Sequence, residues 1–211
     1  LESLGANVKI EGRKVTLTKE EPKENILHCR ESGSTLRFLI PFAMTLGQEI
    51  TFKGSEKLFE RPLDVYETIA KENGFYFEKG RGFLRVCGNL KSGDYRVRGD
   101  ISSQFISGLL FSLSLCPHDS EIIITTAFES KGYIDMTIDV LASFGITVHN
   151  HNYKKFRIKG NQAYKPINFT VEADYSQAAF YLAAGALGSF VVCKGLSAET
   201  KQGDKKIIDV I

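Results

Sequence analysis

A pattern that recurs about every seventy residues constrains the fold of this 211-residue chain more than any other feature of the sequence. Gly5, Gly74 and Gly145 lie 69 and 71 residues apart, and each opens a similar pair of short β-prone runs. Self-similarity at a fixed long period is the signature of repeat architectures. The sequence therefore predicts successive copies of one supersecondary unit.

Each copy shows the same order of segments. Apolar runs begin at Ser32, Ser102 and Tyr175, and β-rich stretches follow them at residues 49–52, 121–125 and 190–193. The first two copies continue into amphipathic segments at 63–74 and 134–145, whose apolar residues recur three and four apart and which end at glycine, as helices often do. Short runs rich in β-branched and aromatic residues, including 168–173, are predicted strands. One unit is therefore predicted to be β-α-β-α-β-β.

The predicted fold class is α/β, with repeats arranged inside out. The three apolar runs form the first helix of each unit, which is apolar on nearly all faces and is expected to be buried. The second helix of each unit, formed by the amphipathic segment, is expected to be half exposed. Helices would then lie inside and sheets outside. A boundary is expected near Lys165 and Pro166. Residues 1–168 are expected to form a substrate-binding domain that lacks its first half-repeat, and residues 169–211 the truncated start of a second domain.

Composition excludes several classes of function. The net charge is +2, from 27 basic and 25 acidic residues, so no global field attracts nucleic acid or an anionic membrane. No apolar stretch approaches the roughly 18 residues that a spanning helix needs, and the first residues resemble neither a signal nor a transit peptide. The four cysteines, Cys29, Cys87, Cys116 and Cys193, lack metal-ligand spacing, which favours buried thiols in a reducing compartment. We expect a cytoplasmic protein without a metal site.

Two helix starts are candidate anion sites. The amides of a first helical turn lack internal partners and lie at the positive end of the helix dipole, so they bind phosphate or carboxylate. Residues 32–35 and 102–104 add hydroxyl groups at two such starts, and Gly33 allows close backbone approach. The alternative is that the serines and threonine only cap their helices.

Two arginines strengthen the anion hypothesis. Arg37 lies inside an otherwise apolar helix, where an unpaired cation costs several kcal/mol, so it needs an acidic partner, with Glu31 as the candidate, or a bound anion. Arg61 precedes Pro62, which fits the first position of a helix, so Arg61 is expected at a helix entrance facing an anion. An exposed loop arginine without a function is the alternative. One repeat later, Ser130, Lys131 and Tyr133 occupy the corresponding loop.

Four segments together resemble the 5-enolpyruvylshikimate-3-phosphate synthase family, also called 3-phosphoshikimate 1-carboxyvinyltransferases. They are ESGSTLRF at 31–38, ERPLD at 60–64, GDISSQFISGLL at 99–110 and SKGYIDMT at 130–137. The resemblance implies six repeats in two domains with the active site between them. It implies transfer of the enolpyruvyl group of phosphoenolpyruvate to the 5-hydroxyl of shikimate 3-phosphate, with release of phosphate. This reaction belongs to the shikimate pathway of aromatic amino-acid biosynthesis and is the target of glyphosate.

The same resemblance implies roles for particular residues. The residues expected to contact shikimate 3-phosphate are Ser102, Ser103, Gln104, Ser130 and Tyr133. Gly33 and Arg61 are expected to contact phosphoenolpyruvate, and Arg37 is expected to support the loop that contains Gly33. It implies no metal or redox cofactor and a monomeric enzyme.

The chain also departs from the family pattern. Glu31 stands where the family more often has Asn. The N-terminal Lys-Ser element and the C-terminal acid/base elements have no match, and Asp174 resembles a fourth-repeat aspartate that is not the catalytic one. No catalytic residue is therefore expected in this chain, which covers roughly half an enzyme and is not expected to turn over alone. The alternatives are a non-catalytic anion-binding half-site and a UDP-N-acetylglucosamine enolpyruvyl transferase. The latter lacks the Ser-Ser-Gln element, and its reactive cysteine has no counterpart here.

Overall fold

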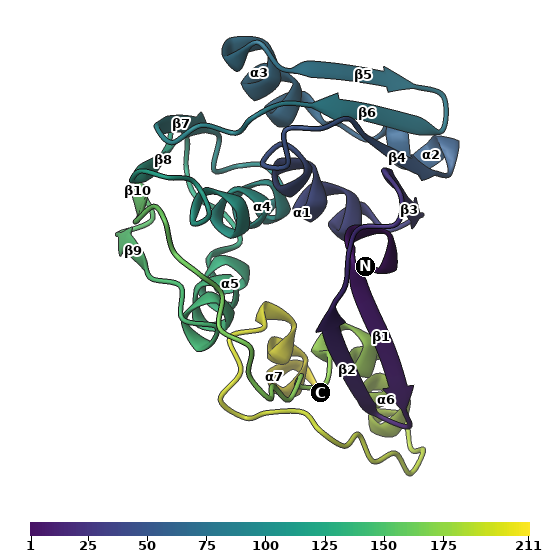
Figure 1. The fold of residues 1–211 in the computed structure, drawn as a ribbon. Helices are drawn as coiled ribbons and strands as arrows, with labels where there is room; N and C mark the ends of the chain where they lie inside the picture. The colour runs from purple at the N-terminus through teal and green to yellow at the C-terminus, as the bar shows by residue number, and fades with distance from the viewer.

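The computed structural model describes residues 1–211, and two β-α-β-α-β-β units follow one another along the chain (Figure 1). The first unit comprises β3 (Ile26–Arg30), α1 (Gly33–Ala43), β4 (Ile50–Gly54), the short α2 (Glu56–Glu60), α3 (Asp64–Asn73), β5 (Tyr76–Gly80) and β6 (Phe83–Cys87). The second comprises β7 (Asp94–Val97), α4 (Ser103–Leu113), β8 (Ser120–Ile124), α5 (Lys131–Ser143), β9 (Val148–His151) and β10 (Lys155–Ile158). The predicted repeat unit is confirmed, with α2 as an unpredicted addition.

The two four-stranded sheets have the same topology. Their strand orders are β3-β4-β6-β5 and β7-β8-β10-β9. In each sheet the first pair is parallel and the hairpin adds antiparallel strands. Gly74 and Gly145 precede the hairpins with φ of 70° and 85°, a left-handed conformation that glycine adopts readily. The glycine period therefore marks one chain reversal per repeat.

The first helices of the two units, α1 and α4, pack against each other between the sheets (Figure 1). Leu36 and Ile40 of α1 and Leu109 of α4 are fully buried, as predicted for helices that are apolar all round. The backbones approach closely, since a Cβ added at Gly108 of α4 would lie 2.6 Å from the carbonyl oxygen of Arg37 in α1. Tyr66 of α3 donates to the carbonyls of Arg37 at 2.8 Å and Phe105 at 3.0 Å. Tyr66 thus joins α3 to both α1 and α4.

The chain begins with η1 (Glu2–Leu4) and a hairpin formed by β1 (Ala6–Glu11) and β2 (Lys14–Lys19). These two strands pair only with each other. The hairpin extends away from the α1–α4 layer, and its residues are mostly exposed (Figure 1). It is the third hairpin of the predicted period.

The C-terminal part contains α6 (Tyr175–Ala186), η2 (Gly203–Lys206) and α7 (Ile207–Val210). The helix predicted from Tyr175 is confirmed, but its predicted burial is wrong, because Phe180 is 77% exposed. The strands predicted at 168–173 and 190–193 are also wrong, since neither segment is in a sheet. The counterparts of 190–193, β4 and β8, each pair on both sides, whereas 190–193 pairs with no strand. Residues 168–173 make one backbone bond in this region, from Ala173 N to Gly195 O at 2.9 Å, outside the run at 190–193. Strand propensity forms a strand only where a partner strand lies alongside. The boundary expected near residue 168 stays a prediction.

All four cysteines are free thiols. Cys29 and Cys116 are buried, and burial raises the pKa of each thiol to about 11. Cys87 and Cys193 are only partly buried, which corrects the expectation of four buried thiols. No helix of this chain has the length and apolar character needed to cross a membrane.

Candidate functional site

A cavity of about 520 Å³ lies where the N-terminal ends of α4 and α5 meet. Hydroxyl and amide groups from both helices line it, together with apolar side chains of α1, α4 and α5. All five residues predicted to contact shikimate 3-phosphate are among its lining residues: Ser102, Ser103, Gln104, Ser130 and Tyr133. The fold therefore brings this predicted set together, from loops about thirty residues apart in sequence.

The N-terminal end of α4 supplies the first group of donors. Ser102 caps the helix, because its hydroxyl oxygen accepts from the backbone N–H of Gln104 at 3.4 Å. Ser32 caps α1 in the same way, accepting from Thr35 N at 3.2 Å. The capping alternative thus holds for both serines. Ser103 lies one residue further, in the first turn of α4, where the helix dipole favours an anion.

The N-terminal end of α5 differs from those of α1 and α4. Ser130 has a left-handed φ of 56° and makes no capping hydrogen bond. Such a conformation is costly for a residue with a Cβ and often occurs at functional sites. Lys131 lies 5.2 Å from the ring centroid of Tyr153, so its charge faces an aromatic ring.

A second cluster of donors lies at the start of α1. A Cβ added at Gly33 would stand 2.9 Å from Nη1 of Arg61 and 3.4 Å from Nη1 of Arg37. Both guanidinium groups therefore approach the bare backbone of this glycine. Arg61 ends α2, and α3 begins only at Asp64, so the prediction that Pro62 occupies the first helical position is wrong. The backbone at Arg61 is extended, with ψ of 147°, and its guanidinium lies beside Gly33 at the start of α1.

Arg37 connects the two clusters. Its Nη1 donates to Oε1 of Gln104 at 2.9 Å, and its Cζ lies 5.0 Å from the ring centroid of Phe105. The ion pair with Glu31 that the sequence offered as an alternative does not form. Burial lowers the pKa of Arg37, and the nearby charge of Arg61 lowers it further. Its Nε is buried and has no hydrogen-bond partner. Two cations held this close favour an anion between or beside them.

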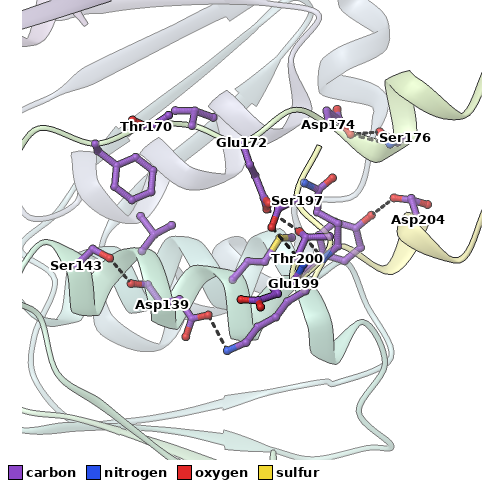
Figure 2. Close-up of a pocket in the computed structure, with 17 residues that line it drawn as sticks. Asp139, Ser143, Thr170, Glu172, Asp174, Ser176, Ser197, Glu199, Thr200 and Asp204 are labelled. Carbon is purple, nitrogen blue, oxygen red and sulfur yellow. Dashed lines mark hydrogen bonds and ion pairs between the residues drawn. The ribbon is translucent and has the colours of Figure 1, made fainter. Parts of the chain in front are cut away.

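A further cavity, of about 680 Å³, separates α5 from the C-terminal segment (Figure 2). Tyr133 lines both cavities, and its hydroxyl donates to Oδ2 of Asp204 at 2.7 Å, which raises the pKa of Tyr133. Lys201 Nζ forms an ion pair with Asp139 Oδ2 at 2.6 Å. The carboxylates that line this cavity repel anions: Asp139, Glu172, Asp174, Glu199 and Asp204. An anionic ligand is therefore favoured in the α4–α5 cavity.

Sequence reasoning missed Asp204 and the partnership of Arg37 with Gln104. Tyr133 and Asp204 are 71 residues apart, and Arg37 and Gln104 are 67 apart. No local pattern signals either pair. In chemical terms the site offers hydroxyl, carboxamide and guanidinium donors, which suit the binding and orientation of anions.

The comparisons with known proteins agree with these features. The family model for EPSP synthase (3-phosphoshikimate 1-carboxyvinyltransferase) matches residues 1–211. A 3-phosphoshikimate 1-carboxyvinyltransferase of Clostridium perfringens is 48% identical over 217 residues, which cover 100% of this chain and 51% of the relative. One of Clostridium kluyveri is 54% identical over 191 residues, covering 90% of this chain and 45% of the relative.

A solved structure shares the fold. The EPSP synthase of Acinetobacter baumannii superposes with a TM-score of 0.73 at 21% identity, covering 94% of this chain and 46% of that chain. This likeness confirms the inside-out α/β fold expected from the repeats. The chain spans about half the length of the curated relatives it matches.

Proposed function

The chain belongs to the EPSP synthase family, and from this premise we propose that it provides one half of a 3-phosphoshikimate 1-carboxyvinyltransferase. The proposed reaction transfers the enolpyruvyl group of phosphoenolpyruvate to the 5-hydroxyl of shikimate 3-phosphate and releases phosphate. The observation that carries the proposal is the convergence of two donor clusters, one at α4 and α5 and one at Gly33, joined through Arg37. Each cluster suits one of two anionic substrates.

The α4–α5 cavity is the proposed site for shikimate 3-phosphate. The first-turn amides of α4 and the hydroxyls of Ser103 and Ser130 supply donors to a phosphate and to ring hydroxyls. The hydroxyl of Tyr133, which donates to Asp204, can accept from a ring hydroxyl. A volume of about 520 Å³ suits a small ligand. The lining includes no carboxylate that would repel the phosphate.

The cluster at Gly33 is the proposed site for phosphoenolpyruvate. Arg61 provides a guanidinium that can bind a phosphate or carboxylate through two parallel hydrogen bonds. Gly33 allows the backbone of α1 to lie close to the ligand because no Cβ intervenes. The positive charge of Arg37 adds to the attraction.

The proposed contribution of this chain to catalysis is binding and orientation. Holding two reactants side by side removes much of the entropic cost of their encounter. The lining of the α4–α5 cavity contains no carboxylate, imidazole or amine. Proton transfer to the methylene group and from the 5-hydroxyl is therefore assigned to groups outside this lining. The proposed enzyme uses no metal or redox cofactor and is a monomer. Its proposed location is the cytoplasm, since both substrates are charged metabolites.

A non-catalytic anion-binding half-site is the second candidate, because the cavity lining holds donors without an acid/base pair. Titration calorimetry with shikimate 3-phosphate tests binding by this chain, which is expected without phosphate release under either candidate. A coupled assay of phosphate release, run after the chain is supplied with the other half of a curated relative, separates the two candidates. Release supports the enzyme, and binding without release supports the half-site. Absence of binding refutes both.

A matched pair of variants locates the binding. Ser103→Ala should weaken shikimate 3-phosphate binding by about 1 to 3 kcal/mol, the range for a lost hydrogen bond to a charged group. Ser143→Ala is the control, because Ser143, at the end of α5, lines the cavity of Figure 2 and not the α4–α5 cavity. Equal affinities for the two variants would remove Ser103 from the site.

A further inference from the structure

Arg37 determines which way the Gln104 side chain faces. A carboxamide has one acceptor oxygen and one NH₂ donor group, while a guanidinium only donates. The contact of 2.9 Å from Arg37 Nη1 to Gln104 Oε1 is therefore satisfied in one orientation of the amide alone. With the oxygen directed at Arg37, the NH₂ of Gln104 faces the other way, and Gln104 is one of the residues that line the α4–α5 cavity.

The guanidinium itself is fixed from several sides. Its Cζ lies 5.0 Å from the centroid of the Phe105 ring, while the Tyr66 hydroxyl, at 2.8 Å, holds only the backbone carbonyl of Arg37. The close packing of α1 on α4 sets the spacing between Arg37 and Gln104. Arg61, near Gly33, repels the guanidinium of Arg37 and disfavours its movement toward α2. A side chain held in this way can orient a more mobile neighbour.

We propose that Arg37 is a positioning residue, which holds the Gln104 carboxamide so that a bound anion meets its NH₂ group and not its oxygen. Without Arg37, the amide would sample both orientations, and the flipped one would place a partial negative charge toward the ligand. The consequence for shikimate 3-phosphate rests on the proposed function. The orientation of Gln104 itself does not, because it is set in the ligand-free protein.

The orientation is tested without ligand, by nuclear Overhauser contacts of the Gln104 side-chain NH₂ protons in the 211-residue chain. The NH₂ signals are assigned by their loss in Gln104→Ala. In the wild type they should contact protons of the other cavity-lining residues, and in Arg37→Met these contacts should weaken as the amide averages. Unchanged contacts in Arg37→Met would overturn the inference.

Tyr66→Phe is the control for a general structural effect. It removes both hydrogen bonds that tie α3 to α1 and α4, but leaves the guanidinium and Gln104 in place. We expect this variant to unfold more easily and to keep the wild-type NH₂ contacts. Loss of these contacts in Tyr66→Phe as well would show that the orientation depends on helix packing and not on Arg37.

A double-mutant cycle tests the consequence for binding. Arg37→Met should raise the Kd for shikimate 3-phosphate about tenfold, comparable to one lost hydrogen bond. In the Gln104→Ala background the same change should raise it less than about twofold, because no carboxamide remains to be oriented. Equal effects in both backgrounds would mean that Arg37 contacts the anion directly or only supports the fold. If the wild type does not bind shikimate 3-phosphate, the proposed function fails, while the NH₂ contacts still decide the role of Arg37.

Discussion

Replacing Gly108 with alanine should destabilise the chain by forcing apart the helices α1 and α4. The new Cβ would lie 2.5 Å from the Tyr66 hydroxyl and 2.6 Å from the Arg37 carbonyl oxygen, and the second is backbone that cannot rotate away. Overpacking of this kind costs about 1 to 3 kcal/mol. Displacing the Tyr66 hydroxyl leaves buried polar groups unpaired, at about 1 to 3 kcal/mol more.

One term acts in the opposite direction. Alanine in a helix interior is favoured over glycine by about 1 kcal/mol. The net expectation is a loss of about 1 to 5 kcal/mol in the free energy of unfolding. For a chain of this size the melting temperature should fall by roughly 2 to 20 °C.

Urea unfolding followed by circular dichroism measures this loss, with thermal melting as a second measurement. Gly203→Ala is the matched control, because Gly203 starts η2 and an added Cβ meets nothing within 4 Å. That variant should stay within about 0.5 kcal/mol of the wild type. A Gly108→Ala chain as stable as the control would refute the close approach of α1 and α4, and with it the geometry that joins Arg37 to Gln104.

Gly33→Ala should weaken phosphoenolpyruvate binding at least about fivefold in titration, because the new Cβ would lie 2.9 Å from Arg61 Nη1 and push that guanidinium away. It should lower the free energy of unfolding by less than about 1 kcal/mol, since the Arg61 side chain is flexible. A large loss of stability with unchanged affinity would contradict this. Asp204→Asn should lower the pKa of Tyr133 toward its ordinary value, because the carboxylate that accepts the hydrogen bond of its hydroxyl is gone. Absorbance at 295 nm measured against pH follows this titration, and a midpoint unchanged from the wild type would contradict the contact. Burial raises the pKa of the Cys29 and Cys116 thiols from 9.0 to about 11, so the stability that their protonated forms contribute should be present below pH 9 and lost as the pH rises to about 11. In denaturant titrations, the free energy of unfolding should fall more steeply with pH in the wild type than in a Cys29→Ala, Cys116→Ala variant. Parallel curves would show that these thiols are not responsible.

The sequence was sufficient for the repeat unit because its signals are local. The first helix of each unit starts with a capping serine and is apolar on nearly all faces, and each hairpin follows a glycine with positive φ. These features act over a few residues, so they are visible without knowledge of the fold. The period places Ser102 and Ser130 in one copy of the unit, whereas the five residues predicted to line the α4–α5 cavity were those that the family resemblance implied.

What the sequence could not reveal depends on partners distant in the chain. The runs at 168–173 and 190–193 have strand composition, but a strand forms only when a neighbour satisfies its backbone groups. The packing of α1 on α4 brings Arg37 to Gln104, 67 residues away in the sequence, and not to Glu31, which is only six residues away. The short helix α2 places Arg61 before a second helix start, where a single loop was expected.

A crystal structure of the chain with shikimate 3-phosphate tests the central claim most directly. We expect the ligand in the α4–α5 cavity, with phosphate oxygens about 2.6 to 3.2 Å from donors of Ser103 and Ser130 and with the Gln104 NH₂ directed at the ligand. Ligand bound only in the cavity of Figure 2, beside Asp139 and Lys201, would contradict it.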